Sequence, residues 1–346
     1  MLSFVKKDVS RNVAEKSVNS LLEFFSSSTC IEFLEEVYSL TLDCLIDSKN
    51  DRLLFRTNLK LAKLYLDLAD IAKLKKVIKV LHESSKAEME TSKRGTQQLE
   101  IYALEIQMYT LIKDNKRLEE IYLQSLSVKS AIPHPKIMGI IRECGGKMYM
   151  RQGKWDKCQS DFFEAFKCYE EAGSKNRIQC LKYLVLANMM SKSNINPFES
   201  PEARPYRGDP EIIVMNDLIL AYQNKDVFNF ERIQSENREK IMDDPFMKDY
   251  IEDLLYNIRT FFISSLQGST IELSDIASSL KISGGEVEEI VSRMILDEVI
   301  CGKIDQVHQV LHTSTPHPKA KFYVEMVRLA SQVENIHNHF NGILIN

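Results

Sequence analysis

The sequence predicts an all-α protein: a right-handed helical-repeat solenoid, followed by a winged-helix subdomain and a C-terminal helix. Three observations support this fold class. Helical periodicity of apolar residues runs almost unbroken from residue 13 to about residue 266. Glycine and proline number only 12 and 9 among 346 residues, about half their usual share, so the chain lacks the turn residues of a β-sandwich or barrel. After about residue 268 the pattern changes to short helices and β-like runs.

The helical region contains a coarse repeat, in which a tyrosine near the end of one helix precedes a polar turn and a second helix. From residue 65 to residue 109 is 44 residues, and from 109 to 149 is 40. These intervals lie at the long end of helix-pair repeats. Because one helix pair cannot bury its own apolar face, we expect the pairs to stack into a solenoid. The tyrosines are Tyr65, Tyr109, Tyr149 and Tyr222, and the predicted turns span 67–72, 113–116, 152–154 and 224–226.

The clearest repeat unit begins at Gly153, where a turn leads into a helix rich in aromatic residues. Its pattern resembles the second helix of a tetratricopeptide unit. Trp155, Phe162 and Phe166 are spaced at i, i+7 and i+11, which keeps them on one stripe of a helix. We therefore expect these three side chains to lie in the core and not to form a ligand site.

A proline-rich segment, 191–210, interrupts the helices and holds four of the nine prolines. Such a density of proline prevents a long helix, and the segment is long for a connector inside a compact domain. We expect an exposed crossover, with a partner-binding loop as the alternative.

The pattern after residue 268 predicts a winged helix. A short helix is expected at 271–280, a turn at 283–285 and a second helix at 287–295. Two β-like runs, hinged at Gly302, predict a two-stranded ribbon at 299–311. Such a ribbon presents an unpaired strand edge, which proteins normally cover, so Ile304 and Val307 are candidate subunit-interface residues. A final amphipathic helix is expected at about 319–343.

Charge and cysteine content limit the class of protein further. A net charge of −4 argues against a surface built for nucleic acid. The seven cysteines contain no C-x-x-C pair, which favours reduced, buried thiols. Because the sequence shows neither a signal peptide nor a long apolar stretch, we expect a soluble protein of the cytoplasm and nucleus, with no membrane contact.

The sequence lacks the motifs of phosphate-binding loops, dinucleotide-binding folds, serine hydrolases and H-E-x-x-H zinc proteases. His337 and His339 form an H-x-H pair, which JAMM-type isopeptidases follow with an aspartate ligand. Only seven residues come after His339, and none is acidic. Solvent-facing histidines on a helix are therefore favoured over a metal site. We predict no catalytic centre, no metal and no cofactor.

The second helix of the predicted winged helix is acidic. From residue 284 to residue 298, five acidic residues oppose the single Arg293, a net of −4. A recognition helix that approaches phosphates should be basic, because counterion release supplies much of the affinity. Protein–protein packing is therefore the expected use of this helix, and nucleic-acid binding is not.

A basic stretch lies earlier in the chain, with a net charge of +4 from residue 60 to residue 79. Runs of this kind are most often the solvated face of a helix. The alternative is a docking surface for an acidic partner, where complementary charge raises the rate of encounter. The six lysines of this basic face are Lys60, Lys63, Lys73, Lys75, Lys76 and Lys79.

A helical-repeat solenoid that ends in a winged helix resembles the PCI scaffold family, which serves the proteasome lid, the COP-nine signalosome and an initiation-factor complex. Longer stretches of the sequence resemble the second-subunit family of the signalosome. These stretches are 100–109, 129–135, 142–148, 161–166, 180–188, 195–198, 241–246 and 302–307. The resemblance implies helical repeats at 1–130, the helical-repeat part of a PCI domain at 131–267, a winged helix at 268–315 and a C-terminal helix at 316–346.

The resemblance also implies a function. A member of this family is a non-catalytic scaffold that supports cullin deneddylation, while metal-dependent cleavage belongs to another subunit. The implied partners are other PCI and JAMM-type signalosome subunits, a cullin–RING ligase and inositol polyphosphate. The family's acidic tail and first repeats have no counterpart here, so part of the surface for the last two is expected to be missing. A proteasome-lid PCI scaffold and a stand-alone transcriptional or nucleic-acid adaptor remain the alternatives.

Overall fold

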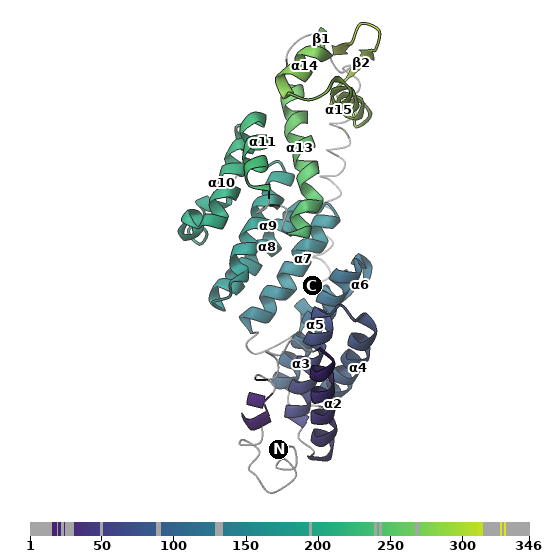
Figure 1. Cartoon of the computed structure of the whole chain (residues 1–346), viewed down its shortest axis with the longest axis vertical. Coiled ribbons are helices and arrows are strands. Elements are labelled where there is room, and N and C mark those ends of the chain that lie inside the picture. The colour runs from purple at the N-terminus through teal and green to yellow at the C-terminus, as the bar shows by residue number, and fades with distance from the viewer. Residues whose placement is uncertain are drawn as a thin grey trace. The chain divides into compact units, whose positions relative to one another are not determined.

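The computed structural model of the chain describes most of its length (Figure 1). The described residues are 31–48, 51–87, 91–128, 134–193, 196–238, 244–266 and 270–313, with isolated positions at 16–18, 20–21, 24, 241, 326 and 329. The chain divides into two compact units, residues 1–216 and residues 217–346. The predicted C-terminal helix, 319–343, and the pair His337 and His339 lie outside the described residues.

The first unit is built of helices that pack in chain order. Helix α3 packs on α2 and α4, helix α5 packs on α4, α6 and α7, and helix α8 packs on α7 and α9. This arrangement confirms the predicted stack of helix pairs. Its helices are α2 (Ile31–Ser48), α3 (Asp51–Asp67), α4 (Ile71–Ala87), α5 (Thr91–Ile112), α6 (Asn115–Ser127), α7 (Pro135–Arg151), α8 (Trp155–Glu171) and α9 (Asn176–Met190). The boundary between the two units falls within α10 (Pro210–Gln223).

Amphipathic helices supply the core of this stack. In α4, Leu74, Ile78 and Leu81 are buried while the lysines between them face outward, because residues three and four apart share one face of a helix. These side chains join a cluster that spans α3, α4 and α5. Its buried members are Phe55, Leu59, Ala62, Leu74, Ile78, Leu81, Ile101, Leu104 and Met108.

The tyrosine repeat corresponds to one recurring helix ending. After Tyr65, Tyr109 and Tyr149, the fourth residue along adopts a left-handed conformation, with φ between 55° and 69°. The next residue's N–H then donates to the tyrosine carbonyl, over 2.9–3.2 Å. This bond closes the helix end in the manner of a Schellman motif. The four predicted turns are therefore confirmed, at 68–70, 113–114, 152–154 and 224–226.

The fourth tyrosine does not fit this pattern. Asp226 N–H donates to the carbonyl of Ala221 at 2.9 Å, with Lys225 in the left-handed conformation. Ala221, and not Tyr222, therefore occupies the position that tyrosine holds in the other three turns. The alignment of Tyr222 with the repeat was wrong by one residue, because a short sequence match does not determine the residue at which a helix ends.

The predicted core stripe of α8 is confirmed for two of its three residues. Phe162 and Phe166 are completely buried, and Phe162 packs against the ring of Tyr183, 5.4 Å between centroids. Trp155 is only half-buried, because it is the first residue of the helix.

The proline-rich segment is packed and contains two short 3₁₀ helices, η2 (Pro197–Glu199) and η3 (Arg204–Gly208). Phe198 and Ala203 are buried at 1% and 0% exposure. Tyr206 lies edge-on to Phe166, 5.6 Å between ring centroids. The prediction of an exposed crossover is confirmed in part: residues 199–210 are mostly exposed, but Phe198 and Ala203 anchor the segment within the first unit.

The second unit contains α11 (Val227–Glu236), α13 (Pro245–Ser265) and a winged helix. The winged helix runs β1 (Thr270–Glu272), α14 (Leu273–Leu280), α15 (Gly284–Leu296), β2 (Gly302–Asp305) and β3 (Val310–Thr313). Its three strands are antiparallel, in the order β1-β3-β2. The solenoid and winged helix together confirm the predicted fold class.

Two details of the predicted winged helix were wrong. Ile271 pairs with Leu311 in β1 and does not belong to the first helix, so the ribbon is a three-stranded sheet. A strand of three residues is too short for its alternation to stand out from a helical pattern. The hinge between β2 and β3 is the turn at 306–309, and Val307 lies in that turn. Gly302 instead begins β2, where an added Cβ would lie 2.6 Å from the His312 carbonyl oxygen.

None of the helices within the described residues combines the length and the apolar character needed to cross a lipid bilayer.

Candidate protein-interaction surfaces

The six lysines of the basic face lie on two adjacent helices of the first unit. Lys60 and Lys63 belong to α3, and the other four belong to α4. Lys60 is half-buried, whereas the remaining five are exposed. Lys75 and Lys79 stand one turn apart on α4, as the sequence predicts, because residues i and i+4 share a helix face.

Lys73 is engaged by acidic neighbours. Its Nζ donates to both carboxylate oxygens of Glu35 on α2, each at 2.8 Å, and lies 3.8 Å from Asp70. The hydrogen bond to Glu35 raises the pKa of Lys73. Its ammonium is therefore partly compensated within the fold, and less of its charge is available to an outside partner than the sequence suggests.

Lys63 faces a different neighbour. Glu100 on α5 has a pKa raised by burial and lowered in part by the charges of Lys63 and Arg56. Lys63 thus helps to compensate a half-buried carboxylate. Lys73 is bound to α2 and Lys63 lies close to the charge of α5, so the six lysines do not act as one uniform patch. Lys75, Lys76 and Lys79 form the exposed remainder, which we call the α4 basic edge.

The acidic helix of the winged helix is α15. It begins with a capping box, in which Ser283 Oγ accepts from the N–H of Glu286 and the Glu286 carboxylate accepts from the N–H of Ser283, both at 3.3 Å. Its one basic residue, Arg293, lies over the ring of Tyr256 at 4.3 Å and 3.9 Å from Asp297. The surface of this helix is acidic, which disfavours an approach to phosphates.

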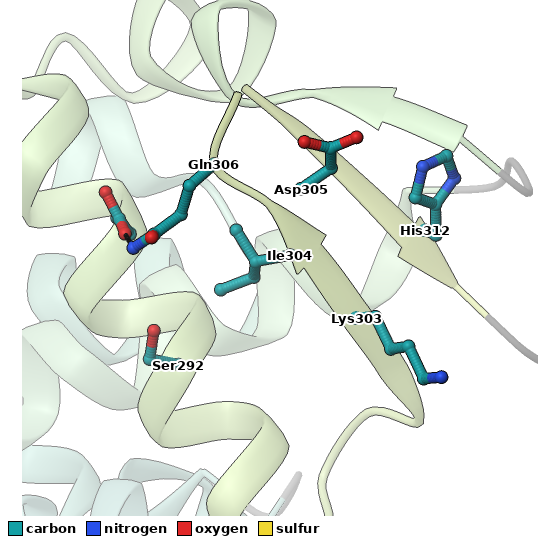
Figure 2. Close-up of a pocket in the computed structure, with 7 residues that line it drawn as sticks. Ser292, Lys303, Ile304, Asp305, Gln306 and His312 are labelled. Atoms are coloured by element: carbon teal, nitrogen blue, oxygen red, sulfur yellow. Dashed lines mark hydrogen bonds between the residues drawn. The ribbon is translucent and has the colours of Figure 1, made fainter. Parts of the chain in front are cut away.

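A groove of about 550 Å³ lies between α15 and the edge strand β2. Figure 2 shows Ile304 pointing from the strand toward α15, and Gln306 reaching the same helix, where its amide donates to Glu288. Lys303 lies opposite His312 in the register of the sheet. The residues that line the groove are Glu288, Ser292, Lys303, Ile304, Asp305, Gln306 and His312.

The two candidate interface residues therefore occupy different places. Ile304 is half-buried and contributes to the wall of the groove. Val307 is 87% exposed in the turn, where Asp305 accepts hydrogen bonds from the N–H groups of Val307 and His308 at 2.9 and 3.1 Å. The His308 imidazole, whose Nδ1 lies 2.8 Å from the Asp305 carboxylate, lowers the pKa of Asp305 most, and the two backbone bonds lower it further. The turn is thus held in shape while it presents an apolar side chain.

A buried charged network, which the sequence did not predict, joins three helices of the first unit. Asp161 on α8 accepts from Tyr122 Oη on α6 at 2.6 Å and from Arg142 on α7 at 2.7 Å. Burial raises the pKa of Asp161, and burial together with the nearby carboxylate raises that of Tyr122. Each of these polar groups has a hydrogen-bond partner within the network, so the network fixes the packing of the three helices.

A second, half-buried charged pair lies on α7. Lys147 and Glu143 are 2.7 Å apart on α7, and Tyr169 Oη donates to the same carboxylate at 2.7 Å. The Lys147 ammonium also lies over the ring of Tyr183, 4.6 Å from its centroid. Removing charged groups from water costs free energy, which a fold tolerates only where each group has its ion-pair and hydrogen-bond partners. We regard both networks as structural.

The described residues contain no group of three or more histidine, cysteine, aspartate or glutamate side chains arranged to hold a metal ion. Burial raises the pKa of the Cys144 thiol to about 11 and that of Cys158 further. Such thiols stay protonated and unreactive at neutral pH.

Comparison with known proteins places the chain in a family. A family model described as the PCI domain matches residues 234–315. The COP9 signalosome complex subunit 2 of Drosophila melanogaster is 50% identical over 97% of this chain and 77% of its own length. The chain belongs to the COP9 signalosome subunit 2 family.

Other relatives support this assignment. The COP9 signalosome complex subunit 2 of Dictyostelium discoideum is 48% identical over 99% of the chain and 78% of its own length. That of Schizosaccharomyces pombe is 44% identical over 89% of the chain and 72% of its own length. The predicted resemblance to the second-subunit family is therefore confirmed, and the proteasome-lid alternative is set aside.

Proposed function

We propose that the chain is a non-catalytic scaffold subunit of a signalosome complex. The observation that carries this proposal is its 50% identity, over nearly its whole length, to a COP9 signalosome complex subunit 2. A solenoid of stacked helix pairs suits a scaffold, because such repeats offer extended surfaces to several partners. Its function would be to support cullin deneddylation, with the cleavage step supplied by another subunit, in the cytoplasm and the nucleus.

The winged helix is the proposed contact with other PCI and JAMM-type subunits. In support, β2 is an edge strand, with β3 on one side only, and an edge of this kind is normally paired or covered. The Val307 side chain adds an exposed apolar contact at the end of that strand. Ile304 acts indirectly, since its side chain faces α15 and keeps the strand in place (Figure 2).

Affinity purification of the tagged chain, followed by mass spectrometry, tests the proposal. Co-purification of other PCI and JAMM-type subunits in equal amounts is the expected result. Recovery of proteasome-lid subunits, or retention on DNA that salt abolishes, would contradict it. Val307→Asp should reduce recovery of the neighbouring subunits while the chain stays folded. Val310→Thr, on the central strand of the same sheet, is the matched control.

The α4 basic edge is the proposed contact with an acidic surface of a cullin–RING ligase, or with an inositol polyphosphate. Reversal of Lys75, Lys76 and Lys79 to Glu should slow association strongly at low salt and little at high salt, because charge acts over about 8 Å at physiological ionic strength. The control variant changes the same charge at dispersed positions, Lys116, Lys175 and Lys248. Equal association rates for the two variants would mean that these lysines form only the solvated face of a helix and no docking surface.

A further inference from the structure

The exposed face of α3 carries basic side chains along most of its length. Four of them recur at i, i+4, i+8 and i+11, so they form one stripe along the helix. Lys60 is half-buried and the other three are exposed. The remaining exposed residues of the helix are the aspartates at its two ends, Asp51 and Asp67. The four basic residues, which we call the α3 basic stripe, are Arg52, Arg56, Lys60 and Lys63.

The α3 basic stripe is distinct from the α4 basic edge. Lys60 and Lys63 belong to the basic face that the sequence predicts, and Arg52 and Arg56 extend them toward the start of the same helix. Lys63 stands eleven positions after Arg52, so the stripe is about 17 Å long. Its successive residues rise by about 5–6 Å along the helix axis. The stripe is therefore regular as well as basic.

This spacing does not stabilise the helix itself. Like charges at i and i+4 repel each other and weaken a helix. Glu100 on α5 offsets part of the repulsion, because its half-buried carboxylate lies close to the charges of Lys63 and Arg56. One carboxylate does not balance four cations. A helix that departs from a local rule in this way is expected to do so at a functional surface.

We propose that the α3 basic stripe docks an acidic α-helix of a partner protein, whose carboxylates follow the same i, i+4, i+8 and i+11 spacing. Two helices that lie side by side bring such stripes together, with a carboxylate opposite each cation. Arg52 and Arg56 add directionality, because a guanidinium can donate two parallel hydrogen bonds to one carboxylate. This surface lies outside the winged helix and the α4 basic edge, so the proposal goes beyond the scaffold function.

The side chains of α3 favour an acidic helix over nucleic acid. Proteins that bind single-stranded nucleic acid combine basic residues with aromatic rings on which the bases stack. The two aromatic residues of α3 are not exposed, since Phe55 is buried and Tyr65 is half-buried. Tyr65 also lies beneath the Lys73 ammonium, 5.4 Å from its ring centroid. The stripe thus offers charge at a regular spacing and no platform for bases.

The test measures the binding of a stapled helical peptide to the folded full chain by fluorescence anisotropy. The probe is an alanine-rich peptide with four glutamates at i, i+4, i+8 and i+11 and a hydrocarbon staple on the opposite face. The control peptide has the same composition, with its glutamates distributed around the helix. We expect the probe to bind about fivefold more tightly than the control peptide at low salt. Its affinity should fall at high salt, because exposed ion pairs are screened.

Paired variants of the chain locate the binding surface. Arg56→Gln with Lys60→Gln should weaken binding of the probe about three- to tenfold, as expected for the loss of two exposed ion pairs. Lys75→Gln with Lys79→Gln removes the same charge at the same spacing on α4 and should leave the affinity unchanged. Arg56→Lys with Lys60→Arg keeps both charges and should bind within about twofold of the unaltered chain. Circular dichroism checks that each variant is folded.

A further variant covers the case in which the double glutamine change unfolds the chain. Arg52→Gln, at the exposed start of the stripe, should weaken binding of the probe about two- to threefold. An unchanged affinity in this variant would contradict the proposal.

Three other outcomes would overturn the proposal. Equal affinities for the probe and the control peptide would show that charge is recognised without its spacing. An equal loss of affinity in the α4 variant would show that binding is spread over the basic surface. Tighter binding of a single-stranded oligothymidine of the same net charge, lost in the Arg56→Gln, Lys60→Gln variant, would assign the stripe to nucleic acid instead.

Discussion

Helices α7 and α15 each contain a pair of adjacent glycines, but the two pairs have opposite surroundings. A Cβ on Gly145 would lie 2.5 Å from the Tyr122 ring, and one on Gly146 would lie 2.7 Å from the Phe162 ring. A Cβ on Gly284 or Gly285 would meet nothing within 4 Å. In α7 glycine permits close packing of aromatic rings, whereas in α15 it only weakens the helix.

The charged side chains of the two regions also differ in how far they are buried and paired. Around α7, acidic and basic side chains are buried or half-buried and paired, as in the contact of Asp161 with Arg142 at 2.7 Å. On α15, the glutamates are mostly exposed, and the only basic residue of the helix is Arg293. The first region is built to hold one arrangement, and the second offers its charges to other molecules.

The largest expected effect is the loss of an aromatic ring from the α7–α8 contact. Phe162→Ala should lower the free energy of unfolding by about 3–5 kcal/mol, because a buried ring leaves a cavity against Gly146. Urea denaturation of the purified chain measures this change. Trp155→Ala, at the half-buried start of the same helix, should cost clearly less. Equal losses for the two variants would contradict the assignment of Phe162 to the core.

The glycines of α7 should show the next largest effect. Gly145→Ala should cost about 1–3 kcal/mol of unfolding free energy, because its methyl group would meet both Tyr122 and the carboxylate of Asp161. The same denaturation experiment reports the change. A Gly145→Ala variant as stable as the unaltered chain would show that the packing around α7 is looser than the distances indicate.

The glycines of α15 should respond in the opposite direction. Gly284→Ala with Gly285→Ala should stabilise the second unit by about 1 kcal/mol, since nothing obstructs the added methyl groups and alanine is a better helix former. Thermal unfolding followed by circular dichroism detects the shift. A loss of stability would mean that glycine is required at the start of this helix.

The smallest expected effect is a dependence on pH through Glu119. Hydrogen bonds from Gln152 and then Lys154 lower the pKa of this carboxylate in the folded chain. Its contribution is therefore present above the unfolded pKa of about 4.3 and is lost as the pH falls through the lower folded value. Glu119→Gln should destabilise by less than about 1 kcal/mol at pH 7, and the difference should shrink in acid. A difference that grows below pH 4 would contradict this sign.

The sequence predicted the features that depend on neighbouring residues. The helix endings after Tyr65, Tyr109 and Tyr149 are set by local patterns and lie where they were expected, whereas α15 begins at Gly284, inside the turn predicted at 283–285. Strand β1 was missed because it has only three residues, and its one inward side chain, Ile271, also fits a helix.

Contacts between residues far apart in the chain could not be predicted from the sequence. Asp161 and Tyr122 are 39 positions apart, and Lys73 and Glu35 are 38 apart. No periodicity indicates which charges will meet across helices. The basic face was therefore identified by composition, while the engagement of Lys73 by α2 came only from the structure.

Hydrogen exchange of the folded chain, followed by mass spectrometry, tests most directly whether α7 is rigidly packed and the start of α15 opens readily. The informative amides are those of Val287 to Glu289, which donate to carbonyls one turn earlier, beginning with Val287 to Ser283 at 3.1 Å. We predict that they exchange through local opening, far faster than the amides of residues 141–150, which should exchange only with global unfolding. Equal protection in the two segments would contradict the account.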